Sequence, residues 1–469
     1  MPVYSFVVGI FFRFFSIILD NIQCYMYNIN YKEKKYILRR EVIKVRLVVN
    51  TTQDEVLVDE LRKLIDTDKA TKLTEYILHH FKDFFTEEPP SKNSTIYNPK
   101  DFIFKPIRQQ DGSMHFKVPI VLGYIITPIC NRRCIYCYAG APYKENKKVY
   151  TSIPLSRIKE IINESASIGI STILLSGGEP FLYIHIYELL SYIISKNIFP
   201  NISTKMGLSY KDALYLSQIG LKQIQVSLDA PNEEIGDLLT GVKGSFKDAI
   251  TSIKSLISVG ISVNTNTVIN SYNIKLIPQL IKLLDDLGVS AVNLTPYGRS
   301  FYKHNDILFP PMEDYTWLFS TVEDIKKNIS AKINVRFEFP SIIEDELGEV
   351  HIKRSICTGG RAGLVLLPDG KVTICERIGD LEGNLLRNFI VGDLMTQSIM
   401  EIWNGEPLKK LLYPDREKYL GTLCYNCTDF TRCNEVYGRC FLRSLIAYNT
   451  PYAPDPLCRR ISNYSIRMV

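Results

Sequence analysis

The chain has 469 residues, of which 46% are hydrophobic and 23% are charged. This balance is typical of a globular protein of two to four domains and excludes a largely disordered chain. The formal net charge of +6 is small for this length, and no concentrated basic and aromatic stripe is present, so the sequence gives no argument for a nucleic-acid partner.

Residues 1–30 form an apolar lead segment that contains PVYSFVVGIFFRFFSIIL and is interrupted by Arg13. Divided in this way, the segment is short for a membrane span, and it lacks the small-residue cleavage site of a secretory signal. We therefore do not favour a membrane anchor. A buried or interfacial helix, or a true start at Met26, is the preferred interpretation.

Residues 31–110 read as a small, separate α+β domain. Residues 41–50 alternate enough to predict a strand, and residues 54–65 and 72–85 are amphipathic and predict helices. A segment rich in Pro, Ser and Asn, residues 87–100, follows them as a linker.

The pattern changes in residues 118–340, where short β-rich runs alternate with amphipathic helices. The predicted strands are 121–127, 171–176, 199–204, 222–228, 262–268 and 290–295. Alternating strands and helices predict parallel strands with crossover helices, and six such units predict an α/β fold that is a partial (β/α)6 TIM-like barrel. An open doubly wound sheet would have a similar pattern.

The eleven cysteines are unevenly distributed. Three lie between residues 130 and 137, seven lie between residues 357 and 458, and Cys24 stands alone. Clustered cysteines in a chain without a recognisable secretory signal indicate metal binding in a reducing cytoplasm rather than disulfides.

Cys130, Cys134 and Cys137 directly follow the first predicted barrel strand, at the end where a β/α barrel places its chemistry. Three thiolates suit an iron–sulfur cluster better than a structural zinc ion, which takes four ligands. A cluster or zinc site completed by a distant fourth ligand is the alternative.

The run CNRRCIYC resembles the CxxxCxΦC signature of radical S-adenosylmethionine (SAM) enzymes, with Tyr136 as the aromatic residue. The second strand leads into SGGEP (176–180), which resembles the GGEP motif of that family. The resemblance implies a 4Fe–4S cluster whose open iron binds SAM. It also implies cleavage of SAM to methionine and a 5′-deoxyadenosyl radical that abstracts hydrogen.

The GGEP resemblance implies that four residues contact the methionine part of SAM: Gly177, Gly178, Glu179 and Pro180. Glycine lets a backbone approach a ligand closely, and a glutamate offers a carboxylate to an ammonium group.

Later strand ends resemble the family less closely. VSLDA (226–230) suggests that Ser227 and Asp229 face the ribose or methionine part of SAM, although a capped turn explains them equally well. In TGVKGSF (240–246), Thr240 replaces the usual arginine, which puts a carboxylate contact in doubt. Asn264, Asn266 and Arg299 are weaker candidates for contact with ligand or substrate.

Residues 345–469 resemble the SPASM extension of radical SAM enzymes, through PDG (368–370), EIW (401–403) and the spacing of CYNCTDFTRC. The resemblance implies two auxiliary 4Fe–4S clusters and therefore three clusters in all. By family order, a near group of three cysteines and a distal group of four would hold them: Cys357, Cys375 and Cys440; Cys424, Cys427, Cys433 and Cys458. Three ligands would leave the near cluster with an open iron. A pair of zinc ribbons is the alternative.

Glu376 directly follows Cys375. In relatives that oxidise a serine or cysteine, an acidic residue here acts as a base, which predicts a catalytic role. A surface residue or a support for the cluster loop is the alternative.

The domain at 31–110 resembles the winged-helix domains with which peptide-maturation enzymes bind a leader peptide as an added strand. We therefore expect a cytoplasmic oxidoreductase that crosslinks a ribosomally made precursor peptide, with flavodoxin or ferredoxin as electron donor. One alternative is a SPASM dehydrogenase, similar to sulfatase maturases, that acts on a protein residue or a small cofactor precursor. Another is a non-enzymatic iron–sulfur electron carrier.

Overall fold

The computed structural model divides the chain into two compact units, residues 1–106 and residues 107–469, which are described separately. It describes residues 85–86, 103–104, 116–139, 152–300, 305–328, 333–337, 342–344, 350–352, 357–379, 381–431, 433–434, 439–456, 458 and 460.

In the first unit, the described residues are two short antiparallel strands, β1 (Phe85–Thr86) and β2 (Ile103–Phe104). The lead segment and the strand and helices predicted for the N-terminal domain lie outside the described residues, except that Phe85 begins β1 rather than ending a helix. The winged-helix-like domain and the four domain limits therefore stay predictions.

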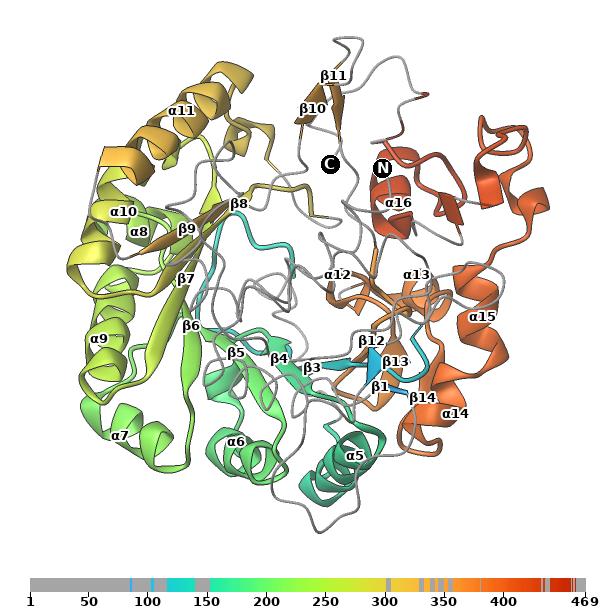
Figure 1. Ribbon diagram of the computed structural model, residues 1–469, viewed down its shortest axis with the longest axis horizontal. Helices are drawn as coiled ribbons and strands as arrows, with labels where there is room; N and C mark the ends of the chain where they lie inside the picture. Colours follow the sequence, from blue (N-terminus) through green and yellow to red (C-terminus); the bar gives the residue numbers. More distant parts are fainter. Residues whose placement is uncertain are drawn as a thin grey trace, which may run out of the picture. The chain divides into compact units, whose positions relative to one another are not determined.

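Seven parallel strands of the second unit lie side by side in the order in which they occur in the sequence (Figure 1). They are β3 (Val121–Thr127), β4 (Thr172–Gly177), β5 (Phe199–Thr204), β6 (Gln223–Ser227), β7 (Ser262–Ile269), β8 (Ala291–Pro296) and β9 (Asn334–Phe337). The six predicted strands are confirmed to within one residue at each end, and β9 is additional. Sequential order excludes a doubly wound sheet, whose strand order reverses, and agrees with a partial TIM-like barrel.

The C-terminal segment extends the same sheet beyond β3. Strand β12 (Gly363–Leu366) pairs parallel with β3, and β13 (Lys371–Thr373) and β14 (Gly392–Asp393) continue antiparallel. Among the described residues, ten strands thus form one sheet. The segment predicted as SPASM therefore packs beside the strand that leads to the first three cysteines. A further antiparallel pair, β10 (Ile342–Glu344) and β11 (Val350–Ile352), stands apart from this sheet.

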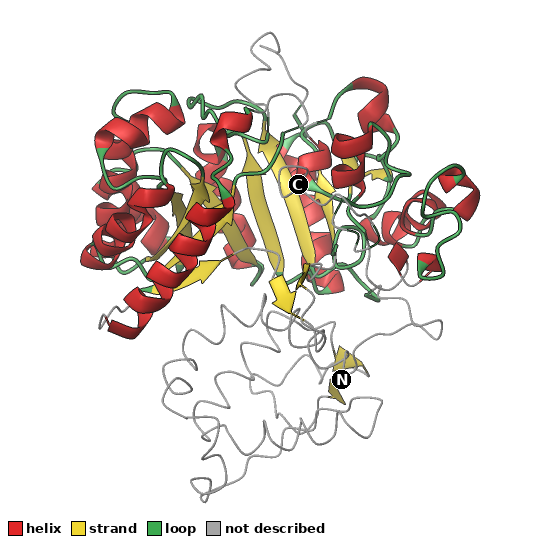
Figure 2. Ribbon diagram, turned by 90° about the horizontal axis from the view of Figure 1, so that it is seen from above, coloured by secondary structure: helices red, strands yellow, loops and turns green. Residues whose placement is uncertain are grey.

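Helices cover the outer face of the parallel strands (Figure 2). They are α5 (Leu155–Ile168), α6 (Ile186–Ser195), α7 (Tyr210–Gln218), α8 (Glu233–Thr240), α9 (Ser245–Ser258), α10 (Ile277–Asp286) and α11 (Met312–Asn328). In α10, the buried residues Ile277, Leu280, Ile281 and Leu284 follow the spacing of one helix face. This face packs on the sheet and makes part of the main core.

The two faces of the sheet differ in polarity. In β7, Val263 and Ile269 are buried in the core beneath the helices, whereas Asn264 and Asn266 point to the opposite face and are half-buried. Successive side chains of a strand alternate between faces, so the inner face of the partial barrel here is polar. A polar, half-buried concave face suits the binding of a polar ligand better than packing of a closed core.

Short helices make up most of the C-terminal segment. They are α12 (Glu376–Gly379), α13 (Gly383–Arg387), α14 (Ile399–Trp403), α15 (Glu406–Leu412) and α16 (Phe441–Tyr448). Trp403, which is fully buried, donates its indole N–H to the carbonyl oxygen of Phe116 at 2.9 Å. This bond ties α14 to the chain just before β3.

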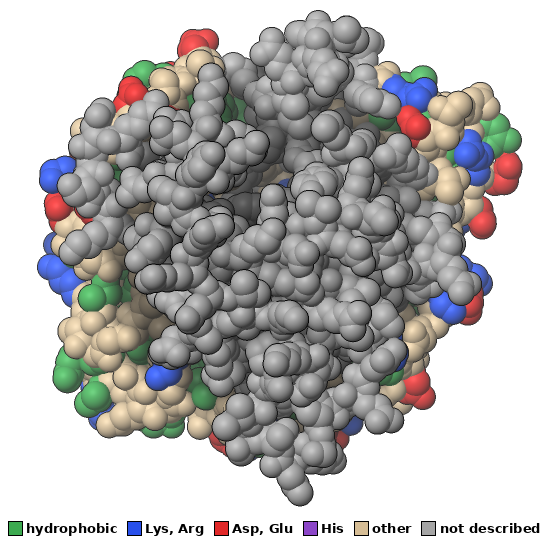
Figure 3. Space-filling model, in the orientation of Figure 1, with side chains coloured by type: hydrophobic (Ala, Val, Ile, Leu, Met, Phe, Trp, Pro, Cys, Tyr) green, Lys and Arg blue, Asp and Glu red, His purple; other side chains and the backbone are tan. Residues whose placement is uncertain are grey.

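The described surface that faces the viewer in Figure 3 carries charges of both signs, with Lys and Arg side chains interspersed among Asp and Glu. This part of the surface therefore offers no large field of one sign. None of the helices within the described ranges combines the length and the apolar character needed to cross a membrane.

Candidate active site

The cysteine loop, residues 128–138, follows β3 and carries the first three predicted ligands. Its start is held by the end of β4. The N–H of Gly178 donates to the carbonyl oxygen of Thr127 (2.7 Å), and the N–H of Glu179 donates to that of Ile129 (2.8 Å). The loop and the GGEP motif are therefore joined by their backbones.

Gly177 and Gly178 are required for this close packing. A Cβ atom on Gly177 would lie 2.2 Å from the carbonyl oxygen of Thr127, and one on Gly178 would lie 2.1 Å from that of Ile129. Gly177 also has a φ of +134°, which L-residues rarely adopt. The structure thus gives both glycines a role in packing against the cysteine loop, whereas the sequence suggests approach to a ligand.

We expect Gly178→Ala to disrupt the cysteine loop, because its Cβ meets rigid backbone rather than a movable side chain. The variant should load less iron at the first three cysteines and lose about 3 kcal/mol or more of unfolding free energy. Gly260→Ala is the control for backbone strain without a clash, since its φ of +83° disfavours alanine but nothing lies within 4 Å of the added Cβ, and it should keep its full iron content. Denaturant unfolding and iron content check both variants, and equal losses would contradict the expectation.

The other side of the cysteine loop is held by the end of α8. The N–H groups of Arg133 and Ile135 donate to the carbonyl oxygens of Thr240 (2.8 Å) and Leu239 (3.0 Å). The Thr240 hydroxyl donates to the carbonyl oxygen of Gly236 within its own helix (2.9 Å). Thr240 therefore supports the cysteine loop through its backbone carbonyl oxygen. Its side chain is neutral and does not supply the charge of the arginine expected at this position.

Glu179 is buried, and its carboxylate already accepts three hydrogen bonds. The donors are the Thr204 hydroxyl (2.7 Å), the N–H of Lys205 (2.9 Å) and the N–H of Phe181 (3.2 Å). Burial raises the pKa of this carboxyl group, and these hydrogen bonds oppose the rise. A carboxylate offers about four acceptor positions, so one remains for a ligand such as an ammonium group.

Pro180, the next residue, is buried and begins the short 3-10 helix η4 (Pro180–Leu182). Proline is tolerated at the first position of a helix because its missing N–H would have no partner there.

Tyr136, Asp229 and Lys205 form a network beside the cysteine loop. The Tyr136 hydroxyl donates to Asp229, whose carboxylate also accepts from the N–H of Val268 (2.9 Å). The Lys205 ammonium lies 3.1 Å from the Asp229 carboxylate and 5.5 Å from the centre of the Tyr136 ring. The structure thus brings the predicted residues Tyr136 and Asp229 together and adds Lys205 to them.

Burial raises the pKa of the Cys130 thiol and raises the pKa of the Cys134 thiol to about 12, while the Lys205 charge opposes both shifts. Only the thiolate binds iron, so loading must release protons from buried thiols. Three thiols on one loop beside a fixed cation are a donor set that fits a 4Fe–4S cluster with three protein ligands.

Ser227, Asn266 and Arg299 lie farther along the sheet. Ser227 ends β6 on its inner face, with Asn266 as its register partner on β7. The side-chain Oδ1 of Asn266 accepts from the Thr295 hydroxyl (3.0 Å). Arg299 forms an ion pair with Asp306 (2.8 Å). The roles of these three side chains in binding ligand or substrate stay predictions.

Charge effects link the seven C-terminal cysteines in the same two sets as the predicted near and distal groups, whose role as cluster ligands stays a prediction. In the near group, burial and then Cys440 and Cys375 raise the pKa of Cys357 to about 12. In the distal group, burial raises the pKa of Cys424 to about 11, and the other three members add to the rise while Arg439 opposes it. Thiols that affect one another in this way lie close together, so the structure assembles three and four cysteines at two places.

Within the described ranges, no three His, Cys, Asp or Glu side chains converge closely enough to hold one metal ion. The ligands of a 4Fe–4S cluster bind different irons and are spaced more widely than the ligands of a single ion.

The near group has no evident fourth ligand among the described residues. Asp455 is the carboxylate beside it, but Arg443 holds both of its oxygens (3.0 and 2.7 Å), and the N–H of Cys440 approaches one of them (3.4 Å). A carboxylate occupied by a bidentate arginine is a poor candidate for a metal ligand.

Glu376 is the first residue of α12, which follows β13. Its side chain lies next to the inner face of β3 and β4. Its Oε1 atom is buried without a hydrogen-bond partner, and so is the Ser176 hydroxyl on β4. Burial raises the pKa of the Glu376 carboxyl group, and the nearby hydroxyls of Ser176 and Tyr138 oppose the rise. A buried carboxylate with an unused oxygen is able to accept a proton or a hydrogen bond from a substrate.

Sequence reasoning misses Lys205, Ser176 and Tyr138 as site residues. Ser176 ends a predicted strand and Lys205 directly follows one, where a barrel places functional side chains, but Ser176 only precedes the GGEP motif and Lys205 belongs to no recognised motif. Their position at strand ends is the signal that would have found them.

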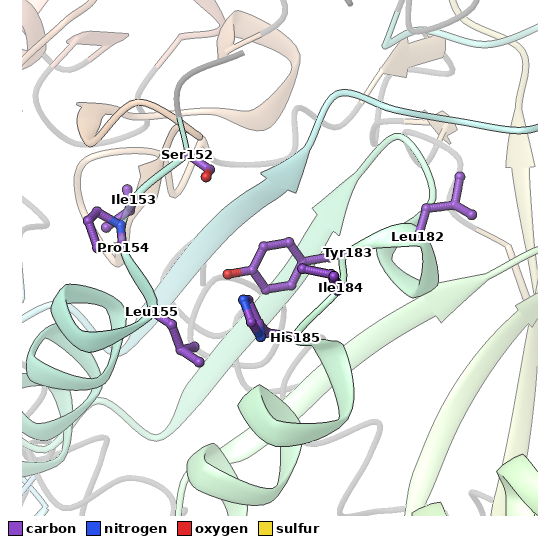
Figure 4. Close-up of a pocket in the computed structure, with 8 residues that line it drawn as sticks. All are labelled: Ser152, Ile153, Pro154, Leu155, Leu182, Tyr183, Ile184 and His185. Atoms are coloured by element: carbon purple, nitrogen blue, oxygen red, sulfur yellow. The ribbon is translucent and has the colours of Figure 1, made fainter. Parts of the chain in front are cut away.

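A pocket of about 280 Å³ lies elsewhere, between the start of α5 and the link from η4 to α6 (Figure 4). It is lined by Ser152, Ile153, Pro154, Leu155, Leu182, Tyr183, Ile184 and His185. None of the predicted site residues lines it, and Ile184 is largely exposed to solvent. The pocket is therefore separate from the cysteine loop.

Two family models match the chain. The Radical SAM superfamily model matches residues 124–284, and the SPASM model, described as an iron-sulfur cluster-binding domain, matches residues 357–428. The second match includes four of the seven C-terminal cysteines, and Cys433, Cys440 and Cys458 lie beyond it.

Two relatives and one solved structure are similar over most of the chain. An AdoMet-dependent heme synthase of Oleidesulfovibrio alaskensis is 24% identical, with 74% of this chain and 88% of the relative covered. A PqqA peptide cyclase of Methylobacterium sp. is 23% identical, with 72% and 86% covered.

Streptococcus suis SuiB bound to its precursor peptide SuiA is 17% identical, with a TM-score of 0.59 and 84% and 89% covered. This likeness supports the fold described above. The two family matches show that the chain contains a radical SAM domain followed by a SPASM domain and is a radical SAM enzyme.

Proposed function

We propose that this enzyme matures a ribosomally made peptide by abstracting hydrogen from a peptide carbon and forming a thioether or carbon–carbon crosslink. The observation that carries the proposal is the near group, which brings three cysteines together without an evident fourth protein ligand among the described residues. An iron with an open position there would accept a substrate thiolate. The similarity to a peptide cyclase supports a peptide substrate.

We propose that Cys130, Cys134 and Cys137 hold the SAM-binding cluster and that the near and distal groups hold two auxiliary clusters. When bound, the first cluster supplies an electron that cleaves SAM to methionine and a 5′-deoxyadenosyl radical. In this scheme, Glu179 offers its remaining acceptor position to the SAM ammonium group, Asp229 and Tyr136 line the site, and the GGEP glycines keep the loop in place.

The electron balance requires an oxidant. A thioether removes two hydrogens from the peptide: one leaves as an atom to the radical, and one leaves as a proton from the cysteine thiol. One electron remains, and we propose that the auxiliary clusters carry it away, while flavodoxin or ferredoxin supplies the electron for SAM cleavage. A reaction that depends on oxygen-sensitive clusters suits a reducing, oxygen-poor cytoplasm.

Mass spectrometry of a short peptide encoded beside this gene tests the proposal. The peptide is incubated without oxygen with reconstituted enzyme, SAM and a reductant, then digested and fragmented. We expect the loss of two hydrogens at one mapped pair of residues, and no loss for a peptide that lacks its leader segment. Unchanged peptide with continued formation of 5′-deoxyadenosine would contradict peptide maturation.

The second candidate is a SPASM dehydrogenase that acts on a protein residue or a small cofactor precursor, with Glu376 as the catalytic base. It is favoured by the buried, unpartnered Oε1 atom of Glu376 and is compatible with similarity to a heme synthase. In the same assay, Glu376→Gln would then abolish product while 5′-deoxyadenosine still forms. A non-enzymatic electron carrier is excluded by the radical SAM assignment.

A further inference from the structure

Arg439 is a buried cation of the C-terminal segment, with only 3% of its surface exposed. Its guanidinium group donates hydrogen bonds to four neutral acceptors. They are the side-chain oxygen of Asn434 (3.1 Å), the Ser444 hydroxyl (3.1 Å) and the carbonyl oxygens of Pro451 and Ala453. Arg439 Cζ also lies 4.6 Å from the centre of the Tyr419 ring. These contacts fix the cation in one place without supplying a negative charge.

Within the described part of the C-terminal segment, no carboxylate forms an ion pair with Arg439. Asp455 is bound to Arg443 (2.7 Å), and Asp429 is bound to Arg460 (2.9 Å). Moving a charge out of water is costly unless hydrogen bonds and an opposite charge compensate it. The neutral acceptors supply the hydrogen bonds, so this position still favours a negative charge nearby.

The partners of Arg439 belong to the stretches of chain that carry the distal group: Tyr419 before Cys424, Asn434 directly after Cys433, and Pro451 and Ala453 before Cys458. The first stretch is tied together by Thr422, whose hydroxyl donates to the carbonyl oxygen of Tyr419 (2.7 Å) and accepts from the N–H of Cys424 (3.2 Å). In agreement with this position, the charge of Arg439 acts on the Cys424 thiol, where it opposes the rise in pKa. The guanidinium group therefore lies at the junction of the segments that hold the four distal cysteines.

Two other arginines contact the distal group, but their charges are more strongly screened. Arg460 has a side chain that is 46% exposed and is paired with Asp429. Arg416 is half-buried and donates to the carbonyl oxygens of Tyr425 (2.9 Å) and Cys427 (3.0 Å). Water and a carboxylate weaken the field of such a charge, whereas a buried charge without a carboxylate keeps it.

We propose that Arg439 is the fixed counter-charge of the distal cluster and raises its reduction potential. Four thiolates give a 4Fe–4S cluster a net negative charge, and reduction adds one electron to it. A buried cation therefore stabilises the reduced form more than the oxidised form. The inference rests on the proposed function only for the assignment of the distal group to an auxiliary cluster, and it holds for any substrate.

An EPR-monitored redox titration of the reconstituted full chain, without SAM or peptide, tests the proposal. Arg439→Gln should shift the ratio of reduced to oxidised distal cluster about 10- to 100-fold toward the oxidised form, which lowers the midpoint potential by about 60 to 120 mV. Arg439→Lys keeps the charge and should keep most of the wild-type potential. Arg460→Gln is the matched control and should shift the ratio less than about threefold, because this charge is exposed and already paired.

Cys427→Ala identifies the signal of the distal cluster, because it removes one of the four distal cysteines. If Cys427→Ala and the wild type have the same iron content and the same spectrum, the distal group holds no cluster, and the cluster assignment fails together with this inference. If the wild type is loaded but Arg439→Gln keeps its potential, only this inference is overturned. The same holds if Arg439→Lys or Arg460→Gln lowers the potential as much as Arg439→Gln does.

Asn434→Asp replaces Arg439→Gln if that variant does not load iron. The new carboxylate has nearly the size of the amide and lies at the atom that Arg439 already contacts, so it neutralises the cation without removing it. It gives up the hydrogen bond from the Asn434 amide to the carbonyl oxygen of Phe430. The potential of the distal cluster should again fall, and an unchanged potential in the loaded variant would overturn the proposal.

Discussion

Replacing Cys130, Cys134 and Cys137 together by alanine is expected to abolish reductive cleavage of SAM while the near and distal groups still bind iron. The three cysteines lie on one loop, and after burial the charge of Cys137 adds to the raised pKa of Cys130 and of Cys134. The variant should lose about one third of the iron of the reconstituted enzyme, since the three proposed clusters hold four irons each. Anaerobic chromatography of 5′-deoxyadenosine and iron analysis measure the two effects.

Cys24→Ala is the control, because Cys24 is the one cysteine of the eleven that belongs to none of the three groups. It should retain full iron content and full cleavage activity. The loop itself should stay close to its position in the triple variant, since its backbone is bonded to the ends of β4 and α8. Cleavage of SAM by the triple variant would mean that these cysteines do not hold the SAM-binding cluster.

The repeating part of the fold was predictable from the sequence, because each strand and each helix carries its own periodicity. In β7 and α10, the spacing of Val263 and Ile269 and that of Leu280 and Leu284 shows which face is buried. The pairing of β12 with β3 was not predictable in this way. It joins residues more than 230 positions apart, and a four-residue strand has too few positions to display a period.

The site shows a similar division. Cysteine spacing predicts the three groups, because ligand number and order are written in the sequence. The packing role of Gly178 cannot be predicted from the sequence. The carbonyl oxygen that excludes a side chain at this position belongs to Ile129, which follows a different strand. The place of Lys205 at a strand end can be predicted from the sequence, but its contacts with Asp229 and Tyr136 cannot.

Replacing Cys357, Cys375 and Cys440 together by alanine is expected to have the opposite effect to the first triple variant. Cleavage of SAM should continue, since Lys205, Glu179 and the cysteine loop are untouched, but the peptide should leave the reaction without a crosslink. The expected product pattern is therefore 5′-deoxyadenosine without loss of two hydrogens from the peptide. Iron content should again fall by about one third.

The distal group provides the matched comparison, because it offers four cysteines in the same C-terminal segment. Cys427→Ala leaves the near group complete, so binding of a substrate thiolate there should survive even if electron transfer slows. Mössbauer spectra of the wild type add an independent measurement, since an iron without a cysteine ligand differs from its neighbours in its quadrupole splitting. Two fully cysteine-ligated auxiliary clusters, or a crosslinked peptide made by the near-group variant, would show that no open iron binds the substrate. The buried carboxylate of Glu376 would then become the stronger candidate for the group that meets it.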